Sequence, residues 1–160
     1  MIILRFTAYA MYVGENIMET NQPKSLVRFL DAQKGVYEKA LNEIRKGRKT
    51  SHWIWFIFPQ IKGLGTSPMA EYYGIENLDE AKAYLSNDIL RERLLEISEV
   101  LLNLKENDPA VIFGYPDNLK LKSSMTLFAL ADPNCHIFQS ALDKFYDGKQ
   151  DTATLKIVLG

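Results

Sequence analysis

Capping residues followed by proline recur along this chain, and they constrain its fold more than any other feature. Ser67-Pro68, Asp108-Pro109 and Asp132-Pro133 have the order expected at a helix N-terminus, where a side chain accepts a backbone N–H and proline has none to lose. Asn77 and Glu80 add the spacing of a capping box. No Asn-Gly or Asp-Gly pair separates two alternating apolar runs, as it would in a β-hairpin. The sequence therefore predicts an all-α fold.

Apolar residues at three- and four-residue spacings predict the course of the helices. The first helix is expected to run from Ser25 to a basic last turn and to stop at Gly47. A long amphipathic helix, ILRERLLEISEVLLNL, follows Asn87 or Asp88. Further N-caps are predicted at Asp117, Asp132 and Asp151. Because the helix lengths vary, we expect a compact multihelical array and not a simple four-helix bundle.

The apolar run WIWFIF, from Trp53 to Phe58, has no alternation. Periodicity alone leaves two interpretations open, a buried strand and a short buried helix. A helical turn would end at Pro59, because proline cannot continue a helix hydrogen-bond pattern.

Size and charge exclude several classes of protein. The 160 residues fit one ordinary domain, and a net charge of −1 gives no global reason to expect nucleic acid or an anionic membrane as partner. The single Cys135 cannot form an internal disulfide, and the apolar runs are too short to span a bilayer. These features predict a cytoplasmic protein.

The amino-terminal stretch differs from the rest of the chain. Arg5 interrupts its apolar residues instead of preceding them, which is unlike a secretion signal. Met18 is followed by polar residues, as at an ordinary start, so whether the residues before it are in the native protein stays open. We expect residues 1–24 to be a peripheral or poorly ordered extension and residues 25–160 to form a single helical domain.

A basic cluster, RKGRK at residues 45–49, flanks the predicted end of the first helix. Cations at a helix C-terminus complement the helix dipole, and simple solvation would explain them. The alternative is an anion site in which Arg48 and Lys49 hold a phosphate or carboxylate. His52 adds an imidazole, and Trp53 and Trp55 offer flat surfaces on which a base or sugar could stack, although tryptophans in apolar runs are more often core residues.

A second polar concentration, DNLKLKSSMTLF, begins at Asp117. On a helix Lys120, Ser123 or Ser124, and then Leu127 fall close to one face, so an ammonium and a hydroxyl could enter a pocket together. His52 and His136 are too far apart in sequence to suggest a metal site, and we predict no metal and no cofactor.

Several stretches resemble, in the same order, the bacterial family known as domain of unknown function 1810. They are DAQKGVYEKALNEIRKGRKTSHWIWFIFPQIKGLGTSPMAEYYGI, LDEAKAYLSNDILRERL, IFGYPDNLKLKSSMTLF and FQSALDKFYDGKQDTATL. The resemblance implies an all-helical single domain, which favours the helical interpretation of WIWFIF, and it implies no established activity. Some members carry the label calpastatin, but an apolar-rich compact domain lacks the disordered character of that protease inhibitor.

The short run DAQK is also similar to a helix of NADAR domains, which are predicted to handle NAD and ADP-ribose derivatives. Four residues set a ligand class to test and no more.

Together these features lead to the hypothesis of a polar pocket between residues 49–60 and the helix at 117–126, binding a small anionic, nucleotide-like ligand. The predicted ligand-binding residues are Arg48, Lys49, Trp53, Gln60, Asp117, Lys120 and Ser124, with His52 as a speculative proton carrier. Whether the protein is an enzyme stays open. The alternative is a non-catalytic protein-interaction or regulatory module with an unknown partner, whose polar side chains would be paired internally.

Overall fold

The computed structural model describes residues 26–160, so the predictions for residues 1–24 and for a start at Met18 lie outside the described residues. The described chain folds into helices joined by short loops, and its one β-type contact is an isolated parallel bridge between Ile61 and Ile75. The all-α prediction is confirmed. The helices are α3 (Val27–Gln33), α4 (Tyr37–Arg45), α5 (Ile54–Ile57), α6 (Pro68–Tyr73), α7 (Leu78–Ser86), α8 (Asp88–Asn103), α9 (Pro109–Phe113), α10 (Asp117–Ala131), α11 (His136–Tyr146) and α12 (Thr152–Leu159).

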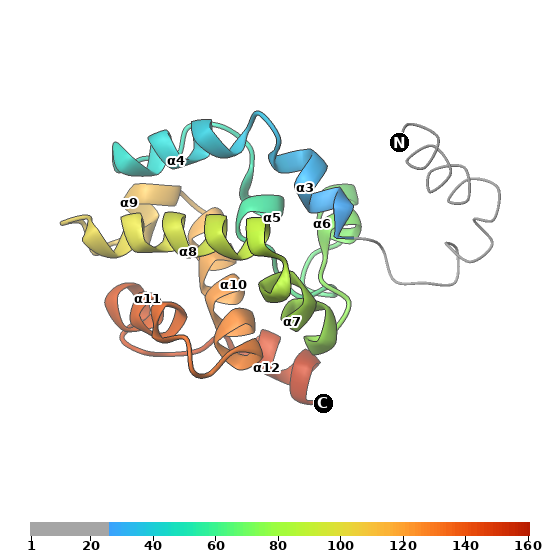
Figure 1. Cartoon of the computed structure of the whole chain (residues 1–160). Coiled ribbons are helices and arrows are strands. Elements are labelled where there is room, and N and C mark those ends of the chain that lie inside the picture. The colour runs from blue at the N-terminus through green and yellow to red at the C-terminus, as the bar shows by residue number, and fades with distance from the viewer. Residues whose placement is uncertain (1–25) are drawn as a thin grey trace, which may run out of the picture.

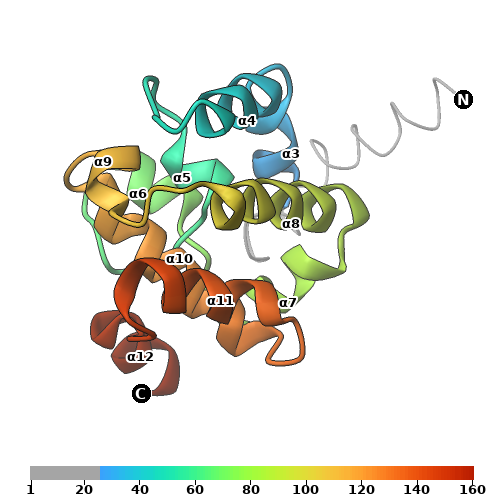
Figure 2. The same cartoon turned by 90° about the vertical axis from the view of Figure 1, so that its left-hand side faces the viewer.

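Helices α8 and α10 organise the packing. Figure 1 shows α4, α8 and α11 one above another with α10 running across them, and Figure 2 gives the same arrangement from the side. Helix α10 contacts α5, α7, α9, α11 and α12, and every residue from Ser123 to Phe128 is buried. This buried stretch mixes apolar residues with hydroxyl residues, and the Ser123 and Thr126 hydroxyls donate to backbone carbonyls of the preceding turn. The described residues share one hydrophobic core, consistent with the single-domain prediction.

The predicted first helix is wrong in one respect, because it is two helices. Lys34 leaves the helical conformation and Gly35 takes a φ of 77°, in the left-handed region that favours glycine. The break turns Gln33 into the core, where its amide nitrogen donates to the carbonyl of Phe56 (2.8 Å) and to the hydroxyl of Tyr84 (3.1 Å). These long-range hydrogen bonds replace the continuous helix.

Most predicted caps are confirmed, and two are wrong. The confirmed N-caps, each accepting a backbone N–H, are Ser67, Asn77, Asn87, Asp108 and Asp151. Asp117 is instead the first residue of α10, and its carboxylate binds lysines. Asp132-Pro133 instead begins a turn, in which the backbone N–H of Cys135 donates to the Asp132 carbonyl (3.0 Å). Helix α11 therefore begins later, at His136.

The run from Trp53 to Phe58 is a buried helical turn, which settles the two interpretations in favour of helix. Helix α5 has only four residues and ends at Ile57, with Phe58 as its C-cap before Pro59. The Trp53 ring packs edge-on against Phe113 and at a tilt against Phe58, with centroids 6.4 and 6.3 Å away. Such a short helix is held by packing and not by its own propensity.

The carboxylate of Glu43 fixes the loop that leads into α5. It accepts hydrogen bonds from the backbone N–H groups of Thr50 (2.8 Å) and Ser51 (3.1 Å), from the Ser51 hydroxyl (2.6 Å) and from the Trp53 indole (2.9 Å). Burial alone would raise the pKa of Glu43, but these hydrogen bonds outweigh it and lower the pKa from 4.5 to about 2. The charged form is therefore the one that organises the loop.

We predict that Glu43→Gln lowers the free energy of unfolding at pH 7 by about 3 kcal/mol, because an amide turns a donor toward groups that donate. A folded-state pKa below the unfolded-state value gives stability that is complete above pH 4.5 and is lost as the pH falls toward 2. In urea unfolding between pH 7 and pH 3, the free energy of unfolding should therefore fall more steeply for the wild type than for the variant.

The matched control is Glu99→Gln, at an exposed position of α8, which should leave both the stability and its pH dependence nearly unchanged. Equal acid sensitivity of the wild type and the Glu43 variant would contradict this role of Glu43.

Candidate functional site

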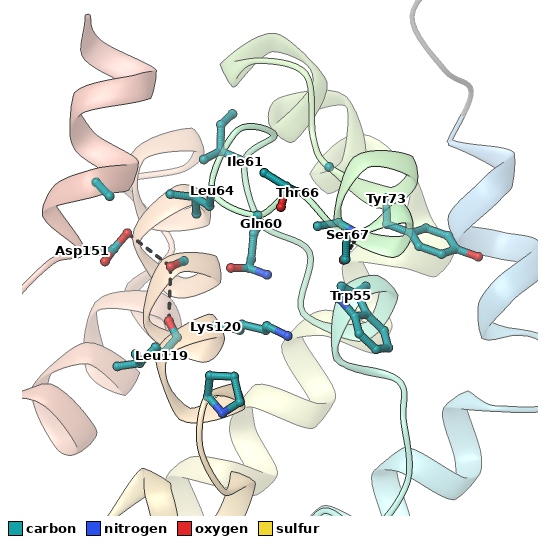
Figure 3. Close-up of a pocket in the computed structure, with 16 residues that line it drawn as sticks. Trp55, Gln60, Ile61, Leu64, Thr66, Ser67, Tyr73, Leu119, Lys120 and Asp151 are labelled. Atoms are coloured by element: carbon teal, nitrogen blue, oxygen red, sulfur yellow. Dashed lines mark hydrogen bonds between the residues drawn. The ribbon is translucent and has the colours of Figure 1, made fainter.

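A cavity of about 440 Å³ opens between α5, the loop at residues 60–67 and α6 on one side and the first turns of α10 and α12 on the other (Figure 3). Its apolar lining includes Ile61, Leu64 and Leu119, with Trp55 and part of Tyr73, whose ring points away from Lys120 and packs against Phe29 and Phe56 (Figure 3). Its polar lining residues are Gln60, Thr66, Ser67, Lys120, Ser123 and Asp151. The size is in the range of sites for small molecules.

The structure brings together the two polar segments that the sequence analysis placed in one pocket. The ammonium of Lys49 lies 2.7 Å from one carboxylate oxygen of Asp117, and that of Lys120 lies 3.3 Å from the other. The backbone N–H of Lys49 also donates to the carbonyl of Ile112, just before α10 (2.8 Å). One carboxylate thus joins the loop after α4 to the start of α10.

Lys49 stabilises the fold at this junction but does not line the cavity. Its side chain is 6 % exposed and that of Asp117 is 18 % exposed. The Lys49 ammonium also lies 5.1 Å from the centroid of the Trp53 ring. A buried ammonium needs such partners, because loss of hydration is costly.

Lys120, Trp55 and Gln60 form the polar end of the cavity. Lys120 extends from α10 toward Trp55, with its ammonium 5.0 Å from the ring centroid and its side chain 26 % exposed (Figure 3). Gln60 lines the same space, and within the described residues its side-chain amide has no hydrogen-bond partner. This end therefore offers a cation, an aromatic face and unused hydrogen-bonding groups.

The opposite end of the cavity is built around Asp151. Its Oδ2 accepts hydrogen bonds from the Ser123 hydroxyl (3.2 Å) and from the Thr154 backbone N–H (3.0 Å) and hydroxyl (2.6 Å). The Asp151 N–H donates to the Thr126 hydroxyl (2.9 Å). These bonds attach α12 to α10 and place a carboxylate on the cavity wall.

Four other predicted site residues lie elsewhere. Trp53 is fully buried and donates to Glu43, so Trp55 takes the place at the cavity wall that was predicted for Trp53. Ser124 is also fully buried, its hydroxyl without a partner among residues 26–160, and Ser123 lines the cavity instead. Arg48 and His52 are exposed and are not among the residues that line the cavity.

The sequence favoured Trp53 over Trp55 and Ser124 over Ser123, and nothing in it indicated that Tyr73 and Asp151 line the cavity. The clustering of two tryptophans and two serines was visible in the sequence, but which member of each pair faces the cavity depends on packing. Asp151 was visible only as a helix cap, because its partner Ser123 is distant in the sequence. Burial raises the pKa of Tyr73, whose hydroxyl points away from the cavity (Figure 3).

Close backbone contact holds the wall formed by α6. The N–H of Ile75 donates to the Gln60 carbonyl (2.9 Å), and the N–H of Lys62 donates to the Ile75 carbonyl (2.8 Å). A Cβ on Gly74 would lie 2.8 Å from the Lys62 Cα, so this contact requires glycine. The Arg28 guanidinium also donates to the Gly74 carbonyl (3.0 Å).

The described residues contain neither a cluster of metal-binding side chains nor a helix that could span a membrane. Among residues 26–160, no group of three or more His, Cys, Asp or Glu is placed to hold a metal ion. None of the described helices is long and apolar enough to cross a membrane.

The comparison with protein families identifies the chain's relatives. The model described as "Protein of unknown function (DUF1810)" matches residues 23–158. The chain belongs to the DUF1810 family. The match covers nearly all of the described chain, including both segments that meet at the Lys49–Asp117 pair, and it confirms the resemblance seen in the sequence.

A solved structure agrees with this DUF1810 fold. The crystal structure of the conserved hypothetical protein Rv1873 from Mycobacterium tuberculosis is similar to this chain at 45% sequence identity, with a TM-score of 0.84. The similarity covers 87% of this chain and 99% of that one. No curated protein matches the chain.

We predict that Gly74→Ala destabilises the protein by about 2–3 kcal/mol, because the new methyl group meets the backbone of Lys62 and must push the cavity wall apart. Thermal and urea unfolding measure the effect. Gly47→Ala is the comparison: its Cβ would meet nothing within 4 Å, and only its φ of 84° opposes the change, at a cost of about 1 kcal/mol. A Gly74 variant as stable as the wild type would contradict the tight wall.

Proposed function

We propose that the protein binds a small anionic, nucleotide-like ligand in the cavity between α5, α6 and α10. The observation that carries the proposal is the convergence of Lys120, Trp55 and Gln60 on one cavity, with the Gln60 amide unused by the described residues. Unused polar groups in a concave site are those that a ligand can engage.

The local charge supports an anion. Lys49 and Lys120 share the carboxylate of Asp117, so two ammonium groups face one carboxylate and the cluster carries a net charge of about +1. Lys49 supplies the compensation for Asp117 in the protein interior. The more exposed Lys120 is left to attract an anion from the cavity.

An aromatic residue supports a ligand with a flat part. Trp55 lines the cavity, and an indole face can stack on a heterocyclic base or a sugar ring. Within the described residues that line the cavity there is no histidine or cysteine, so we propose binding and assign no reaction.

The alternative, a non-catalytic protein-interaction or regulatory module, has one observation in its favour. Val111, Tyr115 and Leu119 are exposed to 53%, 79% and 47% close together in sequence, around the turn from α9 to α10. Exposed apolar residues that gather in one place are typical of interaction surfaces. A ligand screen without response would favour this alternative.

We predict that at least one compound from a panel of NAD, ADP-ribose, AMP and sugar phosphates raises the melting temperature by about 5 °C at saturating concentration. Lys120→Met should weaken its binding at least tenfold, because a charge-assisted contact is lost while the chain length is kept. The same ligand should change the tryptophan fluorescence, and Trp55→Phe should remove that change while Trp53 still emits.

Two variants serve as controls, Lys82→Met on the exposed face of α7 and His52→Ala outside the cavity. Both should bind like the wild type. A panel without any response, or equal affinity of the Lys120 variant, would overturn the proposal.

A further inference from the structure

We propose that the ligand of this cavity is bifunctional: besides its anionic group it carries hydroxyl or ammonium donors, and these bind the carboxylate of Asp151. The inference rests on the proposed function, since it concerns the same cavity. It narrows the ligand class to small anions with hydrogen-bond donors at the other end, such as sugar phosphates or zwitterionic phosphates.

Two residues of opposite charge line the cavity. Lys120 and Asp151 both line the cavity, and they come from different helices. In Figure 3 the Lys120 side chain points toward Trp55, whereas Asp151 lies at the end of the cavity away from Trp55, where it accepts from the Ser123 hydroxyl. Ser123 follows Lys120 by one turn of α10, so the wall changes from cation to hydroxyl to carboxylate along its length.

The Asp151 carboxylate can accept further hydrogen bonds. All three side-chain hydrogen bonds recorded for it go to Oδ2, and Oδ1 accepts none within the described residues. In this part of the chain no Lys or Arg lies within salt-bridge distance of the carboxylate. Because all of these partners are neutral donors, no neighbouring cation of the described chain offsets the charge of the carboxylate.

The two ends of the cavity attract groups of opposite charge. An anion bound at Lys120 is attracted by the net positive charge of the cluster that Lys120 forms with Lys49 and Asp117. A second anionic group near Asp151 would be repelled. A hydroxyl or ammonium at that end would instead donate to the carboxylate. The cavity therefore discriminates between a ligand that is anionic throughout and one with two different ends.

The matched variant is Asp151→Asn, because asparagine also caps helices and its amide oxygen can still accept from the Thr154 N–H. The backbone bond from residue 151 to Thr126 is unaffected by the side chain. Asp151→Ser, a second neutral cap, guards against a loss of structure that is specific to the asparagine. Thermal unfolding shows whether α12 remains attached in each variant.

The experiment is isothermal titration calorimetry of the wild type with inorganic phosphate, ribose 5-phosphate and phosphoethanolamine. These probes share a phosphate and differ in their donors: none beyond the acid itself, hydroxyls, and an ammonium. We expect at least one donor-bearing probe to bind the wild type about tenfold or more tightly than phosphate, the ratio given by one charge-assisted hydrogen bond. The tighter of the two identifies the donor.

The variants separate this inference from the proposed function. Asp151→Asn and Asp151→Ser should abolish the advantage of the donor-bearing probes and leave phosphate affinity unchanged or higher, whereas Lys120→Met should weaken all three probes. Equal affinity of the wild type for the three probes, or an advantage that survives in both Asp151 variants, overturns the bifunctional ligand and leaves the anion site intact. Absence of binding by all three overturns both.

Discussion

The carboxylate of Glu43 sets the course of the chain on which both the core and the cavity depend. Four hydrogen bonds converge on it, and they fix the loop from Thr50 to Trp53 against the end of α4. With that loop in place, Trp53 enters the core and α5 follows it. Lys49 is then held where it meets Asp117 at the start of α10. A single buried acid therefore links a surface-like basic sequence to the centre of the fold.

Other buried polar groups play the same part for the remaining short helices. Arg28 forms an ion pair with Glu80 (2.9 Å) and donates to the carbonyls of Tyr72 and Gly74, which ties α3 to α6 and α7. Helices of four to seven residues are unstable alone, because too few hydrogen bonds repay the cost of nucleation. Here α3, α5 and α6 are held by side chains that reach backbone carbonyls of other segments, and such bonds require each partner to be in one defined position.

Local chemistry explains what the sequence allowed us to predict. Caps such as Ser67, Asn77 and Asp108 act within three residues of themselves, so their signals survive without knowledge of the fold. The break at Gly35 was missed because the apolar spacing continues across it. The gain that favours the break comes from Gln33, whose partners Phe56 and Tyr84 are distant in the sequence.

The candidate site likewise has a part that the sequence predicts and a part that only the fold determines. That the two polar segments meet was predictable from their composition, but the choice of Trp55 over Trp53 and of Ser123 over Ser124 depends on how α5 and α10 rotate against the core. Ser123 and Ser124 are adjacent on α10 and point about 100° apart, so the rotation of the helix decides which hydroxyl faces the cavity. Trp53 precedes α5 and enters the core, whereas Trp55 lies within α5. Asp151 belongs to the site only because α12 returns to α10.

Helix α12 has a further consequence for how the cavity behaves. Thr154 is the one fully enclosed residue of α12 and Val158 packs against the core, so the hydrogen bonds at Asp151 carry much of the helix's attachment. A helix with little buried surface belongs to the less stable part of a structure. A molecule that touches both α10 and α12 would hold α12 in place, so its binding would also stabilise this part of the fold.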